Sequence, residues 1–198
     1  MRTRNIMDNL ALVFTMHKVG SSTVMEALRQ IGRVPERGSS DNLDVITPVS
    51  KYEAVITPVR DPIARNISYL FEEEGKHFLE TNFSNKDILE AYFIKNYHGI
   101  PLSWFDNVFK PLFGIDVYKH GFIKENGWKI LDHRYLIIQT EKMTEMLPGA
   151  FWSLFGEEPS SLYRAKTKET RSYGKIYAEF IEWVTFHDGY LDAMYENK

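Results

Sequence analysis

The residues best suited to chemistry in this chain follow its first run of apolar residues. That run, Leu10–Phe14, predicts a buried strand over about 10–16, and apolar residues at helical spacing then predict a helix over about 21–32. Between the two stand His17, Lys18, Val19, Gly20, Ser21, Ser22 and Thr23. The start of a helix offers unpaired N–H groups and a positive dipole end, so a loop placed there can hold an anion. We therefore interpret residues 18–23 as a candidate phosphate or sulfate site.

Each residue type in this loop suits an anion. Gly20 lets the backbone approach a ligand closely, and Lys18 brings a mobile positive charge. Ser21, Ser22 and Thr23 add hydroxyl donors. Two alternatives are an ordinary strand-to-helix turn capped by Ser21 or Ser22, and a nucleotide-kinase P-loop. The kinase motif G-x-x-x-x-G-K-[ST] needs its lysine after the second glycine, whereas Lys18 precedes Gly20, so the spacing argues against a kinase.

A second polar site is predicted where another short strand meets a helix. Val55–Ile56 indicates the strand, which Pro58 would end or place at the edge of a sheet. The Asp-Pro pair after Arg60 predicts the start of a helix over about 62–74. Arg60 at the strand tip and Ser68, two turns along the helix, could hold one phosphate together. The alternative is that Arg60 pairs with a nearby acid and Ser68 is a solvated helix residue.

Together the two motifs resemble those of the sulfotransferase family that uses 3′-phosphoadenosine 5′-phosphosulfate (PAPS) as donor. In that family a loop after the first strand binds the 5′-phosphosulfate, and a later Arg-x7-Ser pair binds the 3′-phosphate. Lys18–Thr23 match the first motif, and Arg60 and Ser68 match the second in spacing and order. The resemblance implies a single domain over 1–198 with a P-loop-like sulfotransferase fold. It also implies that Lys18 is catalytic, neutralising charge on the leaving group.

A softer resemblance covers the middle of the chain. Residues 104–118, followed by Gly121 and Gly127, resemble bacterial sulfotransferase-like proteins labelled as capsular polysaccharide synthesis proteins. The segment Tyr135–Met143 is similar to the family's strand that ends in an acidic turn before a helix. Many members carry an aromatic residue at the position of Thr140, where it helps to hold adenine, and this chain departs from that pattern.

Composition limits the function classes. The 198 residues are 43% hydrophobic and 26% charged, which is typical of a globular domain. A net charge of −3 provides no global basic field for nucleic acid, so any anion site must be local. The absence of cysteine excludes disulfides, thiolate metal sites and a cysteine nucleophile. The sequence shows no metal-binding motif and no apolar stretch of membrane-spanning length, so we expect a cytoplasmic bacterial-type protein without a transmembrane segment.

The order of elements predicts the fold class. Short apolar strands alternate with helical patterns, which favours α/β architecture with a central, mostly parallel sheet flanked by helices. Ligands in such sheets bind at the carboxyl ends of the strands, where both motifs fall. We expect a loop over 33–42, a helix ended by Glu72–Gly75, helices near 85–96, 104–112, 143–154 and 173–184, and a strand near 134–139.

The sequence does not identify a general base for the acceptor hydroxyl. Relatives use a histidine or glutamate, often from the segment between the two motifs. The candidates in that part of the chain are Glu26, Glu36, Asp41, Asp44 and Glu53. His17 is another, although strand alternation would point it away from Lys18, and His77, His98 and His120 could come from later loops. The basic run 164–171 either closes over the 3′-phosphate, as in relatives, or is a solvated linker.

These observations favour sulfuryl transfer from PAPS to a hydroxyl of a carbohydrate or small metabolite. The expected partners are the nucleotide co-substrate and a hydroxyl acceptor. No metal is needed in principle, because a sulfuryl group carries less charge than a phosphoryl group. The competing hypothesis is a non-catalytic nucleotide-binding or assembly protein that keeps the donor site and lacks the base, and a kinase ranks third.

Overall fold

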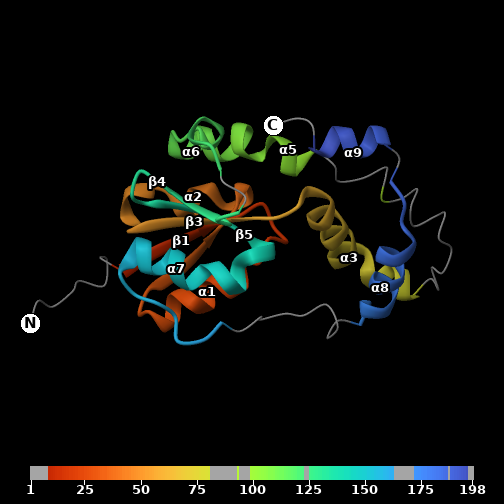
Figure 1. Ribbon diagram of the computed structural model, residues 1–198, viewed down its shortest axis with the longest axis horizontal. Coiled ribbons are helices and arrows are strands. Elements are labelled where there is room, and N and C mark those ends of the chain that lie inside the picture. Colours follow the sequence, from red (N-terminus) through yellow and green to blue (C-terminus); the bar gives the residue numbers. More distant parts are fainter. Residues whose placement is uncertain are drawn as a thin grey trace, which may run out of the picture. The chain divides into compact units, whose positions relative to one another are not determined.

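A computed structural model describes residues 9–80, 93, 99–122, 125–162, 172–186 and 188–195 (Figure 1). The chain divides into two compact units. The sheet unit comprises Met1–Arg60 and Phe105–Ala165, and the helical unit comprises Asp61–Trp104 and Lys166–Lys198. The predicted helix near 85–96, apart from Phe93, and the basic run 164–171 lie outside the described residues. The single domain over 1–198 stays a prediction.

The sheet confirms the predicted fold class. In the described residues it has five strands in the order β2-β1-β3-β5-β4. The parallel strands are β1 (Leu10–Phe14), β2 (Val34–Gly38), β3 (Ala54–Val59) and β5 (Tyr135–Gln139), and β4 (Trp128–Leu131) is antiparallel to β5. The chain is therefore α/β with a mostly parallel sheet, while the P-loop-like detail stays a prediction.

The loop predicted over 33–42 is wrong in its first half, because β2 lies there. This strand pairs with β1 over its whole length, from Leu10↔Val34 to Phe14↔Gly38. Proline and glycine disfavour strands locally, so Pro35 and Gly38 hid it in the sequence. At the border of a sheet the missing N–H of a proline is tolerated, and β2 is the first strand of the sheet order.

Pro58 shows the same rule inside β3. Pairing between β1 and β3 runs from Ala11↔Ala54 to Val13↔Ile56 and then stops. Pairing with β5 continues through Pro58 to Val59. The prediction that Pro58 ends the strand or places it at a sheet edge is wrong, because β3 continues to Val59 between β1 and β5. The missing N–H is tolerated because Pro58 stands where β3 no longer pairs with β1.

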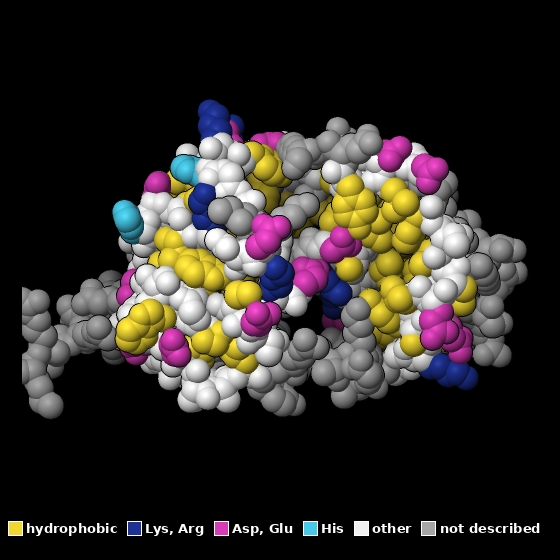
Figure 2. All heavy atoms as spheres, in the orientation of Figure 1, with side chains coloured by type: hydrophobic (Ala, Val, Ile, Leu, Met, Phe, Trp, Pro, Cys, Tyr) yellow, Lys and Arg dark blue, Asp and Glu magenta, His cyan; other side chains and the backbone are white. Residues whose placement is uncertain are grey.

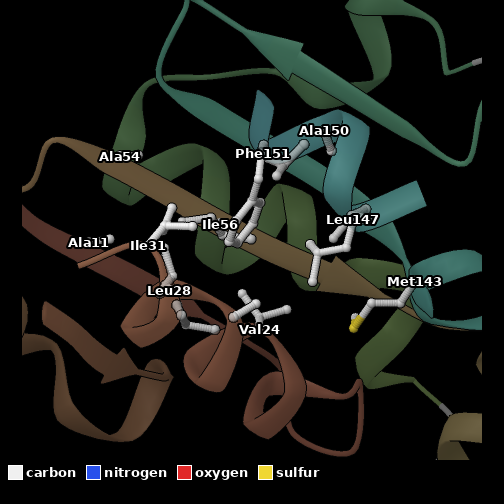
Figure 3. Close-up of a cluster of buried hydrophobic side chains, with 14 residues drawn as sticks. Ala11, Val24, Leu28, Ile31, Ala54, Ile56, Met143, Leu147, Ala150 and Phe151 are labelled. Carbon is white, nitrogen blue, oxygen red and sulfur yellow. The ribbon is translucent and has the colours of Figure 1, made fainter. Parts of the chain in front are cut away.

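Two helices cover one face of the sheet. α1 (Ser21–Gln30) and α7 (Met143–Phe155) bring Val24, Leu28, Leu147 and Phe151 against strand residues such as Ile56 (Figure 3). The predicted helices at 21–32 and 143–154 are thus confirmed within a few residues. Along each strand, successive side chains point alternately to this face and to the opposite face of the sheet.

The opposite face carries an aromatic layer. A π-helical turn, Phe105–Phe109, leads into α6 (Lys110–Phe113), and Figure 1 shows α6 on the other side of the sheet from α1 and α7. Phe14 packs edge-on against Phe113, with ring centroids 5.1 Å apart. The aromatic stripe predicted near 104–112 is therefore helical and part of the core. Short turns and one helix complete the sheet unit: Ser40–Asn42, α2 (Leu43–Ile46), Val49–Lys51, Val117–His120 and Thr140–Lys142.

The helical unit has its own core. It contains α3 (Pro62–Glu80), α5 (Ile100–Trp104), α8 (Gly174–Trp183) and α9 (Asp188–Tyr195). Asp61 begins α3, since its Oδ1 accepts from the N–H of Ala64 at 2.8 Å. Buried residues from this unit are Ile63, Ile67, Leu70, Phe71, Phe93, Tyr177, Phe180 and Met194.

The predicted end of α3 at Glu72–Gly75 is wrong, because the helix continues to Glu80. An interior glycine costs about 1 kcal/mol relative to alanine, which the burial of neighbouring turns can outweigh. The predicted helix at 173–184 is confirmed as α8. No helix in the described part of the chain is long and apolar enough to cross a membrane.

Candidate functional site

The candidate site lies at one edge of the sheet unit. Because β1, β2, β3 and β5 are parallel, their carboxyl ends meet at the same edge. The segments that leave this edge carry the Lys18 loop (residues 15–20), Arg60 and the Thr140–Lys142 turn, and Arg37 lies within β2 next to its last residue. The first predicted motif and Arg60 of the second therefore lie at the same edge of the sheet.

The Lys18 loop has an unusual backbone. β1 ends at Phe14, two residues earlier than predicted, and the loop then has positive φ at His17 (63°), Lys18 (60°) and Gly20 (81°). Residues other than glycine avoid this region because the Cβ approaches the backbone oxygen. The alternation argument that pointed His17 away from Lys18 does not apply, because neither residue is in a strand. Such a conformation persists only where the surroundings hold it.

Two side chains hold the loop from outside. Arg60 Nη1 donates to the carbonyl oxygen of Lys18 at 3.1 Å. Thr140 Oγ1 donates to the next carbonyl oxygen, that of the fully buried Val19, at 2.7 Å. We call these two side chains the loop clamp. They follow the carboxyl ends of β3, which pairs with β1, and of β5, which lies one strand further along the sheet, so two strands besides β1 contribute to the shape of the loop.

Gly20 is required by two independent features. Its φ of 81° strains any residue with a side chain, and a Cβ there would lie 3.2 Å from Met143 Cε and 3.3 Å from Thr140 Cγ2. Thr140 therefore contacts both sides of the loop, with its hydroxyl at Val19 and its methyl group at Gly20. A side chain at this position would require the side chains of Met143 and Thr140 to shift by a few tenths of an ångström.

The first turn of α1 is electrostatically positive. Gly20, rather than Ser21 or Ser22, occupies the cap position, and the first turn contains no acidic residue. Arg37 Nη2 donates to Ser22 Oγ at 3.3 Å and so brings a cation to the first turn of α1. Peptide dipoles and cations of one sign at a helix start favour an anion. Sequence reasoning missed Arg37, because it stood in a segment predicted to be a loop.

Arg60 is mostly buried and has an acidic neighbour. Its side chain is 15% exposed, and its Nε lies 4.0 Å from Glu141 Oε1. At that separation, with a half-exposed carboxylate, the ion pair contributes little. The guanidinium carries five N–H groups in a planar fork, so contact with the Lys18 carbonyl does not exhaust its donors.

Ser68 belongs to the other unit. It lies on α3, in the helical unit, and its side chain is half-buried. The predicted pairing of Arg60 and Ser68 on one phosphate stays a prediction.

Most acids considered as a general base are engaged elsewhere. Glu53 accepts from Arg33 Nε at 2.9 Å, at the amino ends of β2 and β3 and so at the wrong edge. Glu26 pairs with Arg29 on α1. Glu36 lies within β2, with its Oε1 3.5 Å from Lys51 Nζ.

His17 and Asp41 are the described candidates that meet at the correct edge. His17 Nε2 lies 3.3 Å from Asp41 Oδ2, and the two follow the neighbouring strands β1 and β2. Asp44 is exposed on α2, and His120 is exposed in its short turn. His98 and the side chain of His77 lie outside the described residues. Over the described ranges, no group of three or more His, Asp or Glu side chains is placed to hold a metal ion.

The face in Figure 2 shows Lys and Arg side chains in separate places rather than as one basic patch. On the face shown, a phosphorylated ligand would therefore need a local site such as the Lys18 loop with a few cations. The net charge of −3 leads to the same conclusion.

Comparison with known proteins gives one match. The family model NKWYS, described as "Putative capsular polysaccharide synthesis protein", matches residues 79–196. None of the curated proteins and none of the solved structures compared with the chain matches it. The match supports the capsular polysaccharide part of the resemblance drawn from residues 104–127, and the matched range begins after the Lys18 loop, Arg60 and Ser68.

Proposed function

The chain belongs to the NKWYS family, since the match spans more than half of its residues, and we propose that it transfers a sulfuryl group from PAPS to a hydroxyl of a capsular saccharide. The observation that carries this proposal is the contact between Arg60 and the Lys18 loop. It brings Arg60 of the second predicted motif to Lys18 of the first, 42 residues away in sequence, at one sheet edge. The family description supports a saccharide acceptor, and the motifs support the donor.

The residues at the edge suit the donor in charge. A nucleotide with phosphates at both its 3′ and 5′ positions needs two groups of donors. The Lys18 loop, the start of α1 and Arg37 would hold the 5′-phosphosulfate, and Arg60 would hold the 3′-phosphate. Thr140 departs from the expected aromatic and serves the loop instead, so adenine would be held by other groups.

The bound donor would supply the sulfuryl group, and the chain supplies position and charge. Lys18 would neutralise the negative charge that develops on the bridging oxygen of the leaving group. Loss of one such donor typically lowers turnover by about 10²–10³. His17, whose Nε2 faces Asp41, is the histidine of the described edge that could accept the proton of the acceptor hydroxyl. If Nε2–H donates to Asp41, Nδ1 is the basic nitrogen.

A ligand comparison tests the donor site without knowledge of the acceptor. Adenosine 3′,5′-bisphosphate, AMP and ATP are compared by thermal shift and calorimetry in the presence of a metal chelator. At a hundredfold its Kd the bisphosphate should stabilise the protein by about 2.7 kcal/mol, and AMP by clearly less. Equal effects of AMP and the bisphosphate would remove the case for a 3′-phosphate site.

Lys18→Met then separates catalysis from binding. We expect PAPS hydrolysis or transfer to fall by about 10²–10³ and binding of the bisphosphate to fall much less. Lys175→Met, an exposed lysine of the helical unit, is the matched control and should behave as wild type. A wild-type protein that binds the bisphosphate tightly yet neither hydrolyses PAPS nor sulfates any saccharide would support the nucleotide-binding hypothesis instead.

A further inference from the structure

A groove lies beside the sheet edge described above. It has a volume of about 610 Å³ and runs between strand β4 and helix α7 in the sheet unit. This volume is within the range of small-ligand sites. The groove is lined by Glu125, Asn126, Trp128, Lys129, Ile130, Met146 and Ser153.

One end of the groove reaches the candidate donor site's edge of the sheet. Because β4 is antiparallel to β5, its first residue, Trp128, pairs with Ile138 near the carboxyl end of β5. The N–H of Gln139 donates to the carbonyl oxygen of Gly127 at 2.8 Å. Lys142 Nζ donates to the carbonyl oxygen of Glu125 at 2.9 Å. The groove mouth is therefore tied to the turn that carries Thr140.

The lining combines an aromatic wall with exposed polar groups. Trp128 and Ile130 pack partly against the core shared with α7, and their remaining surface, with that of Met146, forms an apolar wall. Glu125, Asn126 and Ser153 are exposed around it. A sugar ring has an apolar face of C–H groups and a rim of hydroxyls. An indole beside carboxylate, amide and hydroxyl groups can satisfy both parts at once.

The groove lies within the part of the chain that the family model matches. All seven lining residues lie within 79–196, the range that matches the capsular polysaccharide family model, whereas the Lys18 loop and Arg60 lie outside it. The part of the chain that relates it to capsular polysaccharide is thus the part that forms the groove.

We propose that this groove is the acceptor site and holds a segment of a capsular saccharide along β4 and α7, with one end at the sheet edge of the Lys18 loop. The proposal rests on the proposed function for its acceptor role. The binding of saccharide can be measured without the donor, so the two can fail separately.

Binding is measured with size-fractionated oligosaccharides from two bacterial capsular polysaccharides, one neutral and one containing uronic acids. The readouts are affinity by calorimetry and the shift of the Trp128 indole N–H signal in NMR spectra. We expect Trp128→Ala to weaken binding by at least about tenfold, as for other aromatic residues at the centre of a binding site. Trp152→Ala, which removes a 60% exposed tryptophan of α7 outside the groove lining, should leave affinity within about twofold.

Asn126→Ala guards against loss of folding in the Trp128 variant. This exposed side chain should be removable without cost to stability, and its loss should also weaken saccharide binding. Bisphosphate binding should be unchanged in both variants. Saccharide binding that survives both substitutions, or wild-type protein that binds no oligosaccharide at millimolar concentration, would overturn the proposal.

Two further outcomes separate this proposal from the proposed function. Trp128-dependent saccharide binding in a protein that ignores the bisphosphate would support the groove and refute the sulfotransferase. Trp128-dependent capture of extended peptides, with no response to oligosaccharides, would overturn the saccharide as occupant.

Discussion

Thr140→Val tests whether the loop clamp shapes the anion site. Valine matches threonine closely in size and keeps a methyl group beside Gly20, so packing against the Lys18 loop is retained. What is lost is the hydroxyl that donates to the carbonyl oxygen of Val19 at 2.7 Å. The substitution therefore isolates one hydrogen bond between segments 121 residues apart in sequence.

The expected cost follows from the burial of the acceptor. A typical hydrogen bond contributes about 0.5–1.5 kcal/mol, but a buried acceptor left without its partner costs about 1–3 kcal/mol. Val19 is fully buried, so the larger range applies. For a chain of this size each kcal/mol lowers Tm by about 2–4 °C. The loop would also populate its left-handed conformation less, so the apparent affinity for adenosine 3′,5′-bisphosphate should fall in proportion.

Urea unfolding and calorimetry measure the two effects on the same protein. The urea midpoint should fall while the slope of the unfolding free energy with urea stays constant. Thr140→Ser keeps the hydroxyl and loses the methyl group, so it should recover most of the bisphosphate affinity. If Thr140→Val keeps wild-type stability and wild-type affinity, the hydroxyl-to-carbonyl contact does not shape the loop and the reasoning is refuted.

Three further substitutions test other parts of the structure. Gly20→Ala should lower bisphosphate affinity and cost at least about 1–2 kcal/mol of stability through its positive φ. Gly32→Ala is the control, because Gly32 has a φ of 72° but no atom within 4 Å of an added Cβ, so this variant carries the backbone strain alone. An equal effect of both substitutions on bisphosphate affinity would contradict the close-approach argument. Arg60→Ala should weaken bisphosphate binding by about 1.5–3 kcal/mol and also lower stability, because the side chain holds the carbonyl oxygen of Lys18. Arg60→Lys should recover only part of the affinity and of the stability. Normal bisphosphate affinity in Arg60→Ala would show that Arg60 has a structural role only. The pKa of Tyr190 is raised to about 12, above the unfolded value of about 10. Burial is the largest cause; a hydrogen bond with Asn66 lowers the pKa, and the Asp61 carboxylate raises it. The folded state then holds this proton more tightly, so its contribution to stability is complete below pH of about 10 and is lost between about 10 and 12. Tyr190→Phe should flatten the dependence of the urea midpoint on pH in that window, and an unchanged slope would contradict the assignment.

The first third of the chain shows what local pattern could predict. The strand, loop and helix around Lys18 were predictable because an apolar run, a glycine and helical spacing are all local signals. The cap at Asp61 was predictable for the same reason, since its partner is the N–H of Ala64. The start and end of each motif depend on neighbours a few residues away.

What the sequence did not reveal depends on distant partners. β2 contains Pro35 and Gly38 and becomes a strand only by pairing with β1. The role of Thr140 is invisible locally, because the carbonyl that it holds belongs to Val19. Arg37 could be assigned to the site only after β2 was known to be a strand next to β1. The available signal in the sequence was a cation near the end of that segment.

The clamp on the Lys18 loop also sets an order of events during synthesis. The strand and helix around the loop leave the ribosome early, and Arg60 follows soon after, but Thr140 emerges only when most of the chain has been made. A nascent chain that ends before β5 can form local turns yet lacks the second side chain that holds the loop. Contacts between segments so far apart in sequence form slowly, because the intervening chain must first be closed into a large loop. The clamped shape of the loop, on which the proposed anion site depends, is therefore completed late, when β5 joins the sheet.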